Sequence, residues 1–145
     1  MIKEIVKQWE SNKGYLKNYI KGLCYDDCNE YEKLVRILIK ECLNHGEPDV
    51  IFDSSEIERI DHGDWQGTEI YLFHKKTYQP EIEDYYIFDN YYGSCSGCDT
   101  LMGIFAYTDN GSPINDKQAD EIMMLLLQMV QRIECLGNLY KEENQ

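Results

Sequence analysis

Apolar residues follow a helical period over the first third of the chain. They recur three and four positions apart over 2–23 and again over 28–43, which places them on one face of each helix. Asn12-Lys13-Gly14 interrupts the first stripe and predicts a kink or break there. Gly46, with Pro48 just beyond it, is typical of a helix stop. The pattern therefore predicts an antiparallel helical hairpin joined through "CYDDCNE".

The period then changes from helix to strand. A weak strand is expected over 57–62, and strong strands over 68–76 and 84–92, with "GDWQG" at 63–67 as the first turn. Both faces of the 68–76 strand are largely apolar, which predicts a central strand that is covered on both sides or shared with a partner. Together, 57–92 predict a three-stranded antiparallel meander.

The last third of the chain predicts more helix. "DTLMGIFAYTD" fits a short helix capped by Asp99 or Thr100, or a fourth strand, and we favour the helix. A long final helix is expected over 116–140, and its apolar stripe is widened by Leu125 and Leu127. A second copy of the chain or the N-terminal helices would cover that stripe, and we favour a monomer over a homodimer.

These elements define the expected fold. Helices followed by a sheet and then by helix again indicate the α+β class, with helices on one face of the sheet. We therefore expect a single domain over 1–145 with an N-terminal helical hairpin, a three-stranded or four-stranded antiparallel sheet and a long C-terminal helix. A chain of 145 residues is long enough to bury a hydrophobic core.

Charge is concentrated in the middle of the chain. The net charge is −13, and residues 47–90 alone carry 12 acidic and 3 basic side chains, a net of −9. Such a field disfavours direct nucleic-acid binding and suits a protein partner with a basic surface. An ordinary solvated acidic surface is the alternative. The partner-binding candidates are Asp61, Asp64, Trp65, Glu69, Glu81, Glu83 and Asp84, with Trp65 as the apolar anchor.

The chain contains neither an apolar run long enough to span a bilayer nor a secretory signal at its N-terminus. We therefore expect a cytoplasmic protein without a membrane partner. In a reducing compartment the six cysteines are expected to be core thiols, metal ligands or redox centres rather than disulfides.

The stretch "YYGSCSGCD" at 91–99 is the most unusual motif. Its Cys95 and Cys98 have the spacing of two ligands on one Zn²⁺ ion, but a single pair is a weak signal. Completing four ligands would take Cys24 with Cys28, or Cys42 with His45. A tight turn without any cofactor is the favoured alternative, with Gly93 or Gly97 at positive φ, and a thiol-redox pair is a further one.

Two of these stretches together resemble a known group. "GDWQG" and "YYGSCSGCD" are similar to motifs of small uncharacterised proteins encoded by phages and prophages, and the resemblance covers about 63–99. No activity comes with that group. The resemblance implies a mobile-element context, in which small acidic proteins inhibit host or rival machinery, as anti-CRISPR and immunity proteins do.

Two functions are therefore expected from different classes. The first is an acidic, non-enzymatic binding protein that inhibits or sequesters a basic or nucleic-acid-handling partner. The second is a metal-binding or thiol-redox protein centred on Cys95 and Cys98.

Overall fold

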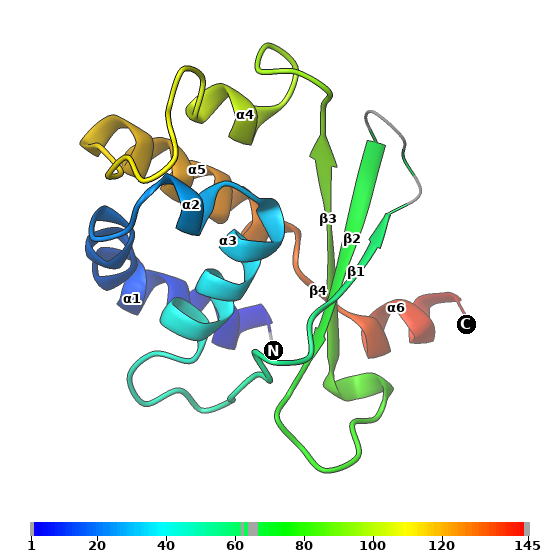
Figure 1. Ribbon diagram of the computed structural model, residues 1–145. Coiled ribbons are helices and arrows are strands. Elements are labelled where there is room, and N and C mark those ends of the chain that lie inside the picture. The colour runs from blue at the N-terminus through cyan, green and yellow to red at the C-terminus, as the bar shows by residue number, and fades with distance from the viewer. Residues whose placement is uncertain (1, 62, 64–66, 144–145) are drawn as a thin grey trace.

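The computed structural model describes residues 2–61, 63 and 67–143 (Figure 1). The helical elements are α1 (Ile2–Lys21), α2 (Tyr25–Cys28), α3 (Tyr31–Leu38), the π-helix η1 (Ile39–Leu43), the 3₁₀ turn η2 (Ile82–Asp84), α4 (Thr100–Ile104), α5 (Asp116–Arg132) and α6 (Leu136–Glu143). The strands are β1 (Glu58–Asp61), β2 (Gly67–His74), β3 (Tyr85–Tyr92) and β4 (Glu134–Cys135).

The four strands form one antiparallel sheet in the order β1-β2-β3-β4. Helices α1, α2, α3 and α5 lie on one side of this sheet, and α6 lies on the other (Figure 1). The α+β class and the meander of β1, β2 and β3 are therefore confirmed. The fourth strand is β4, which the sequence analysis placed inside the final helix.

The core lies between the sheet and the larger helical layer. Alternation along β2 and β3 directs Tyr71 and Phe73 toward this layer, opposite Phe88 and Tyr86, and all four rings are buried. Apolar faces of α1, α3, η1 and α5 pack against them in one continuous cluster. The opposite face of β2 is covered less completely, because Leu72 is only half-buried there.

The N-terminal helices differ from the prediction in their boundaries. Helix α1 runs continuously through Gly14, so the predicted break does not occur there. The second helix begins at Tyr31, because the short helix α2 occupies the connection. Gly46 adopts φ 79°, a conformation that favours glycine, and it follows the end of η1 as predicted.

The predicted final helix over 116–140 is wrong as a single element. Helix α5 ends at Arg132 because Ile133 is extended, at φ −67° and ψ 127°, and Cys135 then pairs with Tyr86 at the free edge of β3. Helix α6 follows immediately. Ile133 and Cys135 are both buried by this arrangement, so pairing at the sheet edge outweighs the helical pattern.

Helix α4 and the core face of α5 agree with the sequence. Asp99 caps α4 by accepting a hydrogen bond from the Met102 amide at 2.8 Å, which confirms the helix rather than a strand. Leu125 is buried within one chain and Leu127 is half-buried, whereas Met124 is 58% exposed.

None of the helices in the described residues has the length and apolar character that a membrane crossing requires.

Candidate functional site

A cavity of about 700 Å³ lies where the sheet meets α3 and α4. Six aromatic side chains line it, and we call it the aromatic pocket: Tyr25, Tyr31, Tyr71, Tyr92, Phe105 and Tyr107. Four carboxylates and one guanidinium also line it, which gives a formal net charge of −3: Glu30, Glu32, Glu69, Asp99 and Arg59. Concave sites with convergent polar groups are the usual places for ligand binding.

The Glu69 carboxylate lies at the sheet wall of the pocket and is only 2% exposed. Its Oε2 accepts a hydrogen bond from Arg59 Nε at 2.6 Å. Its Oε1 accepts from the Tyr71 hydroxyl at 2.7 Å and from the Asn90 amide at 3.1 Å. A buried carboxylate needs such partners to offset the loss of hydration. Glu69 is therefore a structural anion of the pocket wall.

The same network extends to the rim of the pocket through Arg59. Arg59 Nη2 donates a hydrogen bond to Asp61 Oδ2 at 2.9 Å, and the Tyr92 hydroxyl donates to Asp61 Oδ1 at 2.7 Å. The hydrogen bond from Tyr92 lowers the pKa of Asp61, and the hydrogen bond to Glu69 raises the pKa of Arg59. Burial, with the hydrogen bond to Glu69, raises the pKa of Tyr71. At neutral pH Arg59 is therefore positively charged, Asp61 is negatively charged and the Tyr71 phenol is neutral.

Asp99 ends the cysteine motif and joins three parts of the pocket. It is 4% exposed, and its Oδ1 accepts from the Gly93 amide at 2.8 Å and from the Tyr31 hydroxyl at 3.0 Å. Tyr31 in turn accepts a hydrogen bond from the Leu101 amide at 3.1 Å. Burial raises the pKa of Tyr31. The motif is thus the wall-forming connection between β3 and α4.

Glycine is required in this turn, but for a reason other than the predicted one. Within the described residues, positive φ at glycine occurs at Gly46 and Gly111, so the expectation for Gly93 or Gly97 is wrong. A Cβ on Gly93 would lie 2.5 Å from the Cys98 carbonyl oxygen. Gly97, in contrast, has open space around it. Close approach of two backbone segments, rather than a left-handed turn, explains Gly93.

Cys95 and Cys98 lie on the outside of this turn, and both are exposed. Their sulfur atoms are 2.8 Å apart, and the Cys95 amide donates to the Cys98 sulfur at 3.1 Å. Hydrogen bonding from Cys95, and then from Ser94, lowers the pKa of Cys98. A lower pKa favours the thiolate, which is the nucleophilic and oxidisable form.

Within the described residues, the zinc ligands predicted around these cysteines are not brought together. Cys28 and Cys42 are fully buried in the core, where desolvation raises the pKa of each thiol to about 12. Cys24 donates to Asp27 at 3.2 Å, and the His45 ring stacks on Tyr15 at 3.6 Å. Among the described residues, the Cys95–Cys98 pair has no third ligand atom close enough to form a metal site.

The predicted acidic docking surface is divided between the two ends of the sheet. Asp61 and the buried Glu69 lie toward the Gly67–Tyr92 end of the β2–β3 ladder, and both take part in the Arg59 network. The acidic turn of η2 lies beside the His74–Tyr85 end, where Glu81 and Glu83 are exposed and Asp84 is half-buried. Asp64 and Trp65 lie outside the described residues.

Sequence reasoning missed Arg59 and Tyr107 as pocket residues. Period-2 alternation from Tyr71 and Phe73 extends to Glu69, so a buried acid that needs a basic partner was detectable. Tyr107 adopts φ 62° and is fully exposed at the pocket rim. A left-handed tyrosine has no signature in the sequence, because only the loop geometry imposes it.

Comparison with known proteins gives no identity: no protein-family model matches this chain, and no curated protein or solved structure does so either.

Proposed function

We propose that this chain is a non-enzymatic binding protein that docks on a basic protein surface and holds one basic side chain of that partner in the aromatic pocket. The observation that carries the proposal is the lining of the pocket, with six aromatic rings and a net charge of −3. The guanidinium already present, Arg59, is committed to Glu69 and Asp61. Asp99 is occupied by hydrogen bonds from Gly93 and Tyr31, so the exposed Glu30 and Glu32 would attract an incoming cation, with Glu32 exchanging its 3.8 Å ion pair with Arg36.

Charge would bring the partner to the pocket. Glu30 and Glu32 are exposed at its rim, and the whole chain carries a net charge of −13. Opposite charges accelerate encounter and reject acidic partners, but they supply little affinity on their own when salt screens them. Binding would therefore be fast to form and sensitive to salt.

The rings would supply the affinity and the specificity. A guanidinium or ammonium over an aromatic face gains ~0.5–1 kcal/mol when exposed and about 2 kcal/mol when desolvated. Tyr107 holds a left-handed backbone conformation that costs a non-glycine residue roughly 1–2 kcal/mol. Such strain concentrates at functional positions. We assign Tyr107 the role of closing over the bound side chain.

The partner that best fits this chemistry is a nucleic-acid-handling protein, because such proteins present exposed arginine and lysine. Occupying that basic surface would inhibit or sequester the partner. The resemblance of "GDWQG" and "YYGSCSGCD" to phage and prophage proteins supports an anti-defence role of this kind, of the anti-CRISPR or immunity type, in a bacterial cytoplasm.

The test is a fluorescence-anisotropy titration with a short arginine-rich peptide at low and at physiological salt. Wild-type protein should bind it, with weaker binding at physiological salt, and should not bind a glutamate-rich peptide. Glu30→Gln/Glu32→Gln should weaken binding. The matched control is Glu142→Gln/Glu143→Gln, which removes the same charge from exposed positions of α6 on the other side of the sheet.

Tyr107→Gly separates binding from stability. It removes the left-handed tyrosine, so the free energy of unfolding should stay the same or rise, while affinity for the peptide should fall. Equal affinities for the rim variant and the α6 control, with Tyr107→Gly also unchanged, would exclude the pocket as the docking site.

A second candidate function is a reversible thiol switch, and the 2.8 Å separation of the Cys95 and Cys98 sulfur atoms favours it. The two thiols would lose two protons and two electrons to form one disulfide, while oxidised glutathione is reduced to two glutathione molecules. Because the pKa of Cys98 is lowered, Cys98 should be alkylated at a lower pH than a free thiol. Equal alkylation rates at Cys98 and a model thiol across the pH range would exclude this candidate.

A further inference from the structure

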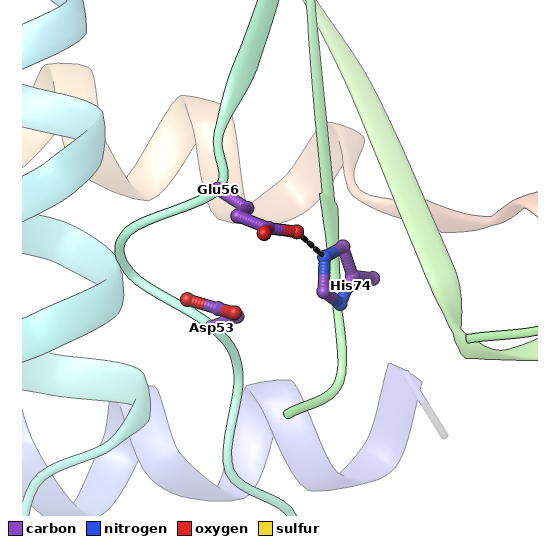
Figure 2. A group of neighbouring side chains, drawn as sticks. All are labelled: Asp53, Glu56 and His74. Carbon is purple, nitrogen blue, oxygen red and sulfur yellow. Dashed lines mark hydrogen bonds and ion pairs between the residues drawn. The ribbon is translucent and has the colours of Figure 1, made fainter. Parts of the chain in front are cut away.

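A second cluster of chemically competent side chains lies at the other end of the sheet from the aromatic pocket. Asp53 and Glu56 come from the segment before β1, and His74 is the last residue of β2 (Figure 2). One ligand atom from each of the three lies within 4.8 Å of the others. In Figure 2 the Glu56 carboxylate points at the His74 ring, and Asp53 lies beside it.

Main-chain contacts hold these two segments together. The Asp53 amide donates to the His74 carbonyl at 2.9 Å, and the Lys76 amide donates to the Ile51 carbonyl at 2.8 Å. Between them, Phe52 is buried and packs edge-on against Phe73 at 5.2 Å. The segment that carries the two acids is therefore fixed against the strand end before any ligand binds.

The Asn44 side chain clamps the same segment from the helical side. Its amide nitrogen donates to the Phe52 carbonyl and its oxygen accepts from the Phe52 amide, both at 2.8 Å. Asp53 itself is oriented by Ser55, whose amide and hydroxyl donate to its Oδ1 at 2.9 and 2.6 Å. Carboxylates that bind metal ions are commonly oriented by hydrogen bonds of this kind.

The geometry around His74 directs one ring nitrogen into the cluster. His74 as a residue is 5% exposed, and its Nδ1 lies 2.7 Å from the Lys75 carbonyl oxygen. A carbonyl only accepts, so Nδ1 carries the hydrogen, and Nε2 faces Glu56 at 2.9 Å. Metal-binding histidines commonly donate their second ring hydrogen to a backbone carbonyl, which fixes the tautomer. Tyr85 packs against the ring at 5.2 Å and limits its rotation.

We propose that Asp53, Glu56 and His74 form a binding site for one divalent first-row transition-metal ion. The ion would bind His74 Nε2 in place of the hydrogen that this nitrogen donates to Glu56 when the ring is protonated, and the two carboxylates would neutralise its charge. One imidazole nitrogen with two carboxylate oxygens suits Zn²⁺ better than Ca²⁺, which prefers oxygen ligands alone. The bound ion would join the acidic segment before β1 to the central strand, independently of the aromatic pocket.

The test is a calorimetric titration of Zn²⁺ into a Cys95→Ser/Cys98→Ser background, so that the exposed thiols contribute nothing. One equivalent should bind, and Ca²⁺ should bind much more weakly. Asp53→Asn/Glu56→Gln should lower the Zn²⁺ affinity at least ~10-fold. Glu47→Gln/Glu58→Gln removes the same charge at exposed positions outside the cluster and should leave the affinity unchanged.

A second measurement uses the unsubstituted cluster, so that it does not depend on how the variants fold. The imidazole resonances of His74 should shift on addition of Zn²⁺, with Nε2 as the affected nitrogen, while those of His45 stay in place. Equal Zn²⁺ affinity in the acid variant and the control, or saturation without any change at His74, would overturn the proposal.

Discussion

Strand β2 has an acid–base pair toward each end, and the two pairs are built in opposite ways. Toward the Tyr92 end the acid is buried, because Glu69 is 2% exposed and Arg59 is partly exposed. At the Tyr85 end the base is buried, because the His74 side chain is 7% exposed and that of Glu56 is 69% exposed.

This difference determines how the charge of each pair depends on pH. Arg59 is a permanent cation, so it presents a positive charge to Glu69 at every pH near neutrality. Histidine titrates in that range, so the second pair changes with pH and its ring nitrogen becomes free for other ligands. The first end therefore suits a fixed electrostatic wall for a pocket, and the second suits an exchangeable ligand. Three measurements test this difference between the two ends of β2.

The largest effect is expected from Glu69→Ala. The substitution removes the acceptor of the Tyr71 hydroxyl and of the Asn90 amide, and it leaves the Arg59 guanidinium paired with Asp61 alone. We expect the free energy of unfolding to fall by roughly 2–4 kcal/mol, somewhat less than for a fully buried pair because Arg59 rehydrates. Urea denaturation measures it, with Glu58→Ala on an exposed position of β1 as the control. A loss no larger than that of the control would show that the buried network is not a stability element.

A smaller effect is expected from Gly93→Ala, in the turn that supports the same end. The new Cβ would lie 2.5 Å from the Cys98 carbonyl oxygen, so the backbone must move. We expect a loss of about 1–3 kcal/mol, the range of overpacking substitutions. Gly97→Ala is the matched control, because nothing surrounds Gly97, and it should change stability by less than ~0.5 kcal/mol. Equal melting temperatures for the two variants would contradict the close-approach explanation.

The smallest effect concerns the His74–Glu56 pair. Burial alone would lower the pKa of His74, but hydrogen bonds to the Lys75 carbonyl and to Glu56 outweigh it and raise that pKa. A raised pKa in the folded state stabilises the protein fully below the unfolded value of about 6.5. This contribution is lost as the pH rises through the folded pKa.

Glu56→Gln, measured in the presence of a chelator, tests this direction of the pH dependence of stability. The variant should be less stable than wild type by ~1 kcal/mol or less at pH 6, because Glu56 is exposed to solvent. The two proteins should converge in free energy of unfolding at alkaline pH. A difference that grows with pH would mean that the buried ring is neutral when folded.

Local pattern was sufficient for part of the candidate site. Period-2 alternation along 68–76 and 84–92 indicated which rings face the core, and "YYGSCSGCD" was recognised as a special turn that ends in a helix cap at Asp99. The reason assigned to Gly93 was wrong, because the approach of 98–99 to its backbone is a contact between segments rather than a torsion preference. The predicted zinc ligands do not meet in the described residues for a related reason, since spacing along the chain carries no information on which helices face the motif.

The α+β class, the helical N-terminal region, the meander and the acidic centre of the chain could all be predicted from the amino-acid sequence, because each depends on local periodicity or on composition. The break after Arg132 depends instead on the packed fold, because β3 offers a free edge with which Cys135 pairs. The packed fold also determines the pairing of Arg59 with Glu69 and the meeting of Asp53, Glu56 and His74. These outcomes depend on backbone hydrogen bonds and buried charges between distant segments, whose free energy is gained only when those segments pack together.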